Sequence, residues 1–226
     1  MRMNMPDNTL RIALLGGTGN LGHALGWRWA RVGYSVVIGS RSQEKAKEAA
    51  QNLNERIGHE RVSGASHADA VSGSDLVVLA VPYAAHQSTL ETIKPHLTGQ
   101  ILIDTTVPLK PPKVTIVQPP REGVVAVYTQ EYLGEKACVV AAFHNVAANL
   151  LDKDTDIVSD VLVTSDNTDA TATVIKLAKA AGCHALDAGA LANAIVMESL
   201  TSILIHINKT YKTGHAGIRI TGLNEE

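Results

Sequence analysis

The chain has 226 residues, 45% of them hydrophobic but only 4% aromatic, and a formal net charge of −2 at pH 7. This length allows one large domain or a domain with a small lobe, and the charge balance argues against a nucleic-acid or membrane-surface partner. The chain has two isolated cysteines, Cys138 and Cys183, a pattern that favours a reducing cytoplasm and predicts no metal site. Residues 1–9 are polar and lack the apolar core of a signal peptide, so we expect a flexible tail there.

The first predicted strand, 10–15, leads directly into a glycine-rich turn. Gly17, Gly19 and Gly22 have the spacing G-x-G-x-x-G, and helical spacing of apolar residues follows over 20–32. After a strand and before a helix, this spacing predicts a dinucleotide site, in which the turn approaches a pyrophosphate and the helix N-terminus supplies free N–H groups.

The second predicted strand, 34–39, indicates which dinucleotide binds. An NAD site usually carries an acid near this point to hold the ribose hydroxyls, and this chain has Gly39 there. Ser40, Arg41 and, one helical turn later, Lys45 offer a hydroxyl and two cations, which suit a 2′-phosphate. The sequence therefore predicts NADP.

Strands and helices continue to alternate through the first two thirds of the chain, which predicts an α/β fold of the Rossmann type, a doubly wound parallel sheet. The further strands are expected at 61–63, 75–81, 100–104 and 137–142, and the helices at 42–57, 67–72 and 85–96. The loops after two of these strands, Pro82-Tyr83 and 105–108, are expected to line the nicotinamide side of the cleft.

Residues 108–135 are rich in proline and predict a long irregular connection that acts as a lid or an interface arm. Beyond it, strands are expected at 158–164, 183–187 and 217–221, with helices at 168–181 and 190–211. The stretch 191–207 is apolar but carries several polar residues, so it predicts a buried helix. We therefore expect a dinucleotide domain over 10–150, a small C-terminal α/β lobe on the substrate side over 151–226, and a homo-oligomer, most simply a dimer.

Four segments give the chain a resemblance to the NADPH-dependent F420 reductase family, which moves a hydride between NADP and the deazaflavin coenzyme F420. They are 13–22, Gly39-Ser40-Arg41 with Lys45, 139–144, and the most specific one, 186–201. The likeness runs from residue 10 to 223 and implies a deazaflavin stacked on the nicotinamide between two lobes. The predicted cofactor-binding set is Gly17, Thr18, Gly19, Asn20, Leu21, Gly22, Ser40, Arg41, Lys45, Val81, Pro82, Val107, His144, Asn145, Ala190 and Leu191.

By position, Val81, Val107, His144 and Leu191 would stand near the two rings. The chain departs from the family at His144-Asn145-Val146-Ala147, where the family has His-Thr-Ile-Pro, and at Ala190, where it has Pro. Both departures lie where the resemblance implies the second substrate.

Hydride transfer between two ring cofactors needs orientation and exclusion of water more than catalytic side chains. No catalytic residue is therefore assigned; His144 is a candidate hydrogen-bond donor to the second ring and equally a candidate structural histidine. Asn145 and Asn193 could bind ring edges or cap neighbouring backbone. The pair Tyr132 and Lys136 has Y-x-x-x-K spacing, but Gly134 and the following strand argue against the helix that such a dehydrogenase pair needs.

Two alternatives remain open at this point. One is an NADPH-dependent flavin or ferric reductase, in which the 144–147 loop accepts FMN or FAD. The other is a non-catalytic module that senses NADP, because glycine-rich turns of this kind also open redox-sensing regulators.

Overall fold

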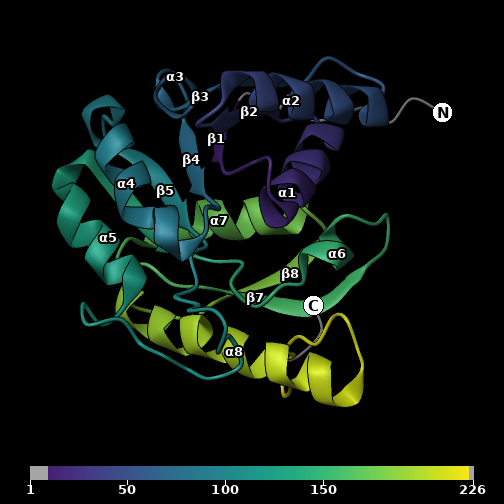
Figure 1. The fold of residues 1–226 in the computed structure, drawn as a ribbon, viewed down its shortest axis with the longest axis vertical. Coiled ribbons are helices and arrows are strands. Elements are labelled where there is room, and N and C mark those ends of the chain that lie inside the picture. Colours follow the sequence, from purple (N-terminus) through teal and green to yellow (C-terminus); the bar gives the residue numbers. More distant parts are fainter. Residues whose placement is uncertain (1–9, 224–226) are drawn as a thin grey trace.

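The computed structural model describes residues 10–223; the predicted flexible tail over 1–9 lies outside them. A parallel six-stranded sheet has the strand order β3-β2-β1-β4-β5-β6. Its strands β1 to β5 are labelled in Figure 1. Its strands are β1 Arg11–Leu15, β2 Ser35–Ser40, β3 Val62–Ser66, β4 Leu76–Leu79, β5 Gln100–Asp104 and β6 Ala137–Ala141. This architecture confirms the predicted Rossmann-type α/β fold, and the order of the strands reverses between β1 and β4.

Helices cover both faces of this sheet. On one face lie α1 Asn20–Arg31, α2 Gln43–Ile57 and α7 Thr168–Ala180; on the other lie α3 His67–Val71, α4 Tyr83–Ile93 and α5 Val125–Leu133, with the start of α8 Ala194–Tyr211. Ile12 and Leu14 of β1 pack into the first layer, and Ala13 and Leu15 into the second. Burial on both faces explains why these strands are continuous apolar runs rather than alternating ones.

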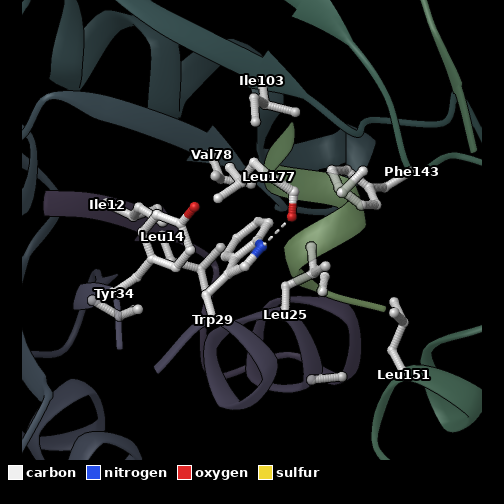
Figure 2. Close-up of a cluster of buried hydrophobic side chains, with 14 of the residues drawn as sticks. Ile12, Leu14, Leu25, Trp29, Tyr34, Val78, Ile103, Phe143, Leu151 and Leu177 are labelled. Atoms are coloured by element: carbon white, nitrogen blue, oxygen red, sulfur yellow. Dashed lines mark hydrogen bonds between the residues drawn. The ribbon is translucent and has the colours of Figure 1, made fainter. Parts of the chain in front are cut away.

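Trp29 of α1 lies at the middle of the first layer (Figure 2). Its indole N–H donates to the carbonyl of Leu177 in α7 at 2.9 Å, and its ring meets Phe143 edge to face. The C-terminal part of the chain therefore shares a core with the nucleotide fold and does not form a separate one.

The C-terminal part holds a second, two-stranded parallel sheet of β7 Ile157–Val163 and β8 Cys183–Asp187, with the short helix α6 Ala148–Leu151 before it. The buried guanidinium of Arg28 in α1 joins it to the nucleotide fold by donating to the carbonyls of Leu151, Ala181 and Thr155 at 2.7, 2.8 and 3.0 Å. The expected α/β lobe is present; a domain boundary at residue 150 stays a prediction.

Three expectations about the second half need correction. The segment 108–135 is not irregular throughout, because α5 occupies Val125–Leu133 and a short 3₁₀ turn, Gly134–Lys136, follows it. No strand forms at 217–221, although the carbonyl of Ile218 accepts from the N–H of Asp160 at 2.8 Å, so this segment lies against β7.

Further 3₁₀ turns are Lys94–His96 and Leu191–Asn193.

The third correction concerns the last long helix, which is not buried. Val196 and Ile203 are 58% and 47% exposed, and only a third of the apolar stretch Leu191–Tyr211 is inside the structure. By length and composition this stretch would suffice to cross a membrane, a weak criterion that helices of soluble proteins also meet. In Figure 1, α8 lies along the lower edge of the molecule.

Of the two free thiols, Cys183 is buried and Cys138 half-buried.

Candidate functional site

A cavity of about 430 Å³ opens at the carboxyl edge of the six-stranded sheet, where the strand order reverses. In open α/β sheets this crevice is the place where dinucleotides bind. Eight of the predicted residues line the cavity: Thr18, Gly19, Asn20, Leu21, Ser40, Arg41, Val81 and Pro82. Thr105, from the loop 105–108 expected at the cleft, and Gly16, from the glycine-rich segment, also line it. Four further lining residues were not singled out in the sequence: His67, Ala80, Ala85 and Thr89.

The start of α1 is built to receive an anion. Gly19 is its N-cap and offers no side-chain acceptor, and the first turn contains no acid, whereas Arg28 and Arg31 stand in the last turn. The N–H groups of the first turn are therefore free to donate to a ligand, and the helix dipole favours negative charge at this end of the helix. Gly22 lets the helix start this close to the turn, because a Cβ there would lie 2.6 Å from the carbonyl oxygen of Gly16.

Arg41 lines the same cavity from the end of β2. Its side chain is exposed and makes no ion pair within the described part of the chain, so the guanidinium is available to a phosphate. Lys45 lies in the first turn of α2, where its N–H donates to Ser42 at 3.3 Å, and its side chain is exposed but does not line the cavity. Gly17 and Gly22 lie beneath the turn and shape it without lining the cavity.

The carboxyl end of β5 carries a buried polar cluster that the sequence reasoning missed. Asp104 is 1% exposed; its Oδ2 lies 3.0 Å from His86 Nε2 and accepts from the Thr129 hydroxyl at 2.7 Å. Its Oδ1 accepts from the N–H of Thr106 at 2.9 Å, which fixes the loop that leads to Val107. Burial alone would raise the pKa of Asp104, but the hydrogen bonds and the charge of His86 hold it below its usual value.

His144 follows β6 and is buried, with both ring nitrogens lacking a hydrogen-bond partner. Burial lowers its pKa to about 4, partly offset by Asp104, so the ring is neutral near pH 7. The residue before it, Phe143, has φ of +65°, a conformation that is strained for a bulky side chain. The hydroxyl of Thr201 in α8 donates to the His144 carbonyl at 2.8 Å.

Further buried polar atoms without partners are Thr106 Oγ1, Asn145 Oδ1 and Thr164 Oγ1. Such atoms cost free energy unless a ligand or water satisfies them. Thr106 follows β5, and His144 and Asn145 follow β6, so their unpartnered atoms fit a polar ring ligand at the ends of these two strands. The amide of Asn145 also donates to the Asp160 carbonyl at 2.7 Å, and Asn193 donates to Ala188, which is the backbone-capping role considered above.

The predicted residues of the second-substrate side, His144 and Asn145 among them, do not line the cavity. Val107 is half-buried, Leu191 is buried with its N–H bonded to Asp166 at 3.0 Å, and Ala190 is exposed. Their contact with a second ring stays a prediction. Tyr132 lies in the last turn of α5, which ends at Leu133, and Lys136 lies beyond it in the 3₁₀ turn Gly134–Lys136, so no single helix carries the pair, as Gly134 predicted. Neither residue lines the cavity.

A larger cavity, about 1010 Å³, lies between β7, β8 and the segment 219–223. Strands of the six-stranded sheet contribute nothing to its lining, so it lacks the glycine turn and the strand ends that a dinucleotide needs. The cavity at the reversal of strand order is therefore the candidate cofactor site.

Comparison with known proteins gives concordant results. Residues 11–108 match a protein family described as coenzyme F420-dependent NADP oxidoreductase. The F420-dependent NADP reductase of Methanothermobacter thermautotrophicus is 38% identical over 226 residues, covering 96% of this chain and 97% of that protein. A solved structure of a candidate F420-dependent NADP reductase from Arthrobacter sp. FB24 has a TM-score of 0.79 at 27% identity and covers 94% of this chain and 99% of that one. Rat metalloreductase STEAP3 is 28% identical over 87% of this chain, but only 37% of that protein is covered.

Proposed function

This chain belongs to the family of coenzyme F420-dependent NADP oxidoreductases, and from that membership we propose that it transfers a hydride between NADP(H) and coenzyme F420. One observation carries the proposal: the likeness to F420-dependent NADP reductases extends over 96% of the chain, through 139–144 and 186–201 as well as the nucleotide fold. When bound, NADP supplies the nicotinamide that gives or takes the hydride, and F420 the deazaflavin that exchanges it.

The chain's own residues bind, orient and shield these rings. The N–H groups at the start of α1 receive the pyrophosphate, and Ser40 and Arg41 receive the 2′-phosphate. Val81 and Pro82 form the apolar end of the same cavity, where they exclude water from the nicotinamide. We propose no side chain as an acid or base, because the chemistry of this reaction lies in the two rings.

The second ring is proposed to lie against the ends of β5 and β6. Support comes from the unpartnered ring nitrogens of His144 and the unpartnered hydroxyl of Thr106. As a neutral imidazole, His144 has one N–H to donate to a ring carbonyl or to a reduced, anionic ring.

Anaerobic stopped-flow with NADPH and F420, with FMN and FAD in parallel, tests this function. We expect loss of the visible band of oxidised F420 and no comparable reduction of either flavin. Reduction of the flavins alone would move the chain to the flavin or ferric reductases. Binding of NADPH without reduction of any acceptor would make it an NADP sensor.

We also propose that the protein is a cytoplasmic homodimer. Val196, Leu200, Ile203 and Ile207 follow one another at helical spacing along α8 and are exposed or half-buried, so they form an apolar stripe that a second copy can cover. The free thiols Cys138 and Cys183 suit a reducing compartment. A monomeric mass in light scattering at micromolar concentration would refute the dimer, and Ile203→Glu should produce that mass if the stripe is the interface.

A further inference from the structure

Two side chains leave the sheet next to each other at one end of the cofactor cavity. The register of β2 and β3 pairs Ser40 with Ser66, so the residues that follow, Arg41 and His67, emerge from adjacent strands. Both line the cavity, together with Ser40. Arg41 is predicted from its place after β2, whereas His67 has no such signal in the sequence.

His67 occupies the space in which NAD-binding proteins keep an acidic side chain. That acid stands near the end of β2, here Gly39, and accepts hydrogen bonds from the ribose hydroxyls. A Cβ on Gly39 would lie 3.2 Å from His67 Nδ1 and 2.5 Å from the Leu15 side chain. The glycine thus leaves room for an imidazole, and a hydrogen-bond donor stands where an acceptor would be expected.

The imidazole of His67 is also incompletely satisfied. It is 7% exposed, and its buried Nδ1 has no hydrogen-bond partner. Burial, and then the charge of Arg41, lower its pKa, so the ring is neutral near pH 7 and carries a single N–H. Asp69, the acid of its own helix α3, instead accepts from the hydroxyl of Ser66 at 2.7 Å.

We propose that His67 is a specificity residue that donates a hydrogen bond to the 2′-phosphate of NADP, beside Arg41. The proposal rests on the proposed function only in taking NADP as the coenzyme. It follows that Arg41 and His67 together replace the acid of an NAD site, with a charged donor and a neutral one in place of a carboxylate.

The test measures binding of two fragments, adenosine 2′,5′-bisphosphate and 5′-AMP, by calorimetry without F420. His67→Leu should weaken the bisphosphate about 10-fold and leave 5′-AMP within about twofold, because only the phosphate loses a hydrogen bond. His67→Asn, which keeps an N–H donor, should recover part of the loss. His59→Asn, at an exposed position, is the matched control and should bind both fragments as the wild type does. Melting temperatures identify any variant that fails to fold.

Equal weakening of both fragments would overturn the proposal, because His67 would then contact the adenosine and not the phosphate. Unchanged binding of both by a folded His67→Leu would overturn it too. F420 reduction by the wild type is assayed separately: a protein that discriminates through His67 but reduces no F420 refutes the proposed function and leaves this proposal intact. If the wild type reduces F420 and His67→Leu still prefers the bisphosphate over 5′-AMP as strongly as the wild type does, only the proposal for His67 is refuted.

Discussion

The phenyl ring of Phe143 meets the indole of Trp29 edge to face, with the ring centroids 5.9 Å apart and the planes at 77° (Figure 2). Phe143 has φ of +65° and is the residue immediately before His144. A strained backbone persists only where its surroundings hold it, and here a contact from the nucleotide-binding helix α1 does so. The position of His144 therefore depends on core packing around Trp29.

Phe143→Leu should lower the free energy of unfolding by about 1–2 kcal/mol, because the edge-to-face pair and part of the buried area are lost. Urea denaturation followed by tryptophan fluorescence measures this change. The KM for F420 should rise while the dissociation constant for NADPH stays the same. Tyr211→Leu, at a 76% exposed aromatic, is the control and should change neither stability nor KM. A Phe143→Leu protein as stable as the wild type would show that Trp29 does not hold this turn.

Arg41→Ala should weaken NADP binding about 10- to 100-fold, because a charge-assisted hydrogen bond to the 2′-phosphate is lost, and should leave NAD binding nearly unchanged. Lys45→Ala should have a smaller effect, since Lys45 does not line the cavity. Calorimetry with both coenzymes at two salt concentrations measures the difference. Equal losses for NAD and NADP would place Arg41 away from the 2′-phosphate.

Arg41 and His67 differ in how far the local sequence could predict them. The glycine turn and Arg41 were predictable because each lies directly after a strand whose apolar run is plain in the sequence. His67 was not, because its neighbour Arg41 is 26 positions away and meets it only through the register of β2 and β3. The helix α5 was hidden by the prolines that precede it, and the expected strand at 217–221 has an extended sequence but no ladder partner.

Glu198 of α8 is a buried acid with an unusual environment. Its carboxylate accepts from the N–H groups of Val125 and Ala126 at 3.0 and 3.1 Å and so caps α5 from 73 residues away. Desolvation outweighs these bonds and raises its pKa to about 7 from 4.5. Between these values the folded protein holds a proton that the unfolded chain has released, so the free energy of unfolding falls as pH rises from 4.5 to 7.

Glu198→Gln should remove that dependence. The loss of stability between pH 4.5 and 8 should be smaller in the variant by about 3 kcal/mol, the equivalent of the pKa shift. Urea denaturation at a series of pH values gives both curves, and the comparison of slopes cancels the altered hydrogen bonds to α5. Parallel curves would mean that Glu198 ionises normally in the folded protein.

Asp104 gives the free energy of unfolding the opposite dependence on pH. Its pKa lies below its usual value, so its contribution to stability is present above about pH 4 and is lost as pH falls through the lower, folded value. Asp104→Asn should cost about 3 kcal/mol near pH 7, because the His86 and Thr129 donors lose their carboxylate. Thr129→Val removes one hydroxyl and should cost about 1 kcal/mol. The cost of Asp104→Asn should shrink as pH falls through that lower, folded value; a cost that stays constant with pH would contradict the assignment.

His144 should not titrate in the pH range in which the enzyme works. With a pKa of about 4 it stays neutral from pH 5.5 to 8, so it acts as a hydrogen-bond donor and never as an acid. The pH profiles of kcat for wild type and His144→Gln should therefore have the same shape over this range, although the variant is slower. A step present in the wild type and missing in the variant would refute this, and would show that a bound ring raises the pKa of His144.

The guanidinium of Arg28 has a consequence for protein engineering. It sits in α1, yet it is only 5% exposed and directs its donors to the carbonyls of residues 150, 151, 153, 155 and 181. A chain truncated near residue 150, or a chimera that grafts the acceptor-side portion of a relative onto this nucleotide fold, would leave a cation enclosed without its acceptors. The two portions are therefore not interchangeable modules, and any exchange between relatives has to carry the arginine and its five carbonyl acceptors as one set.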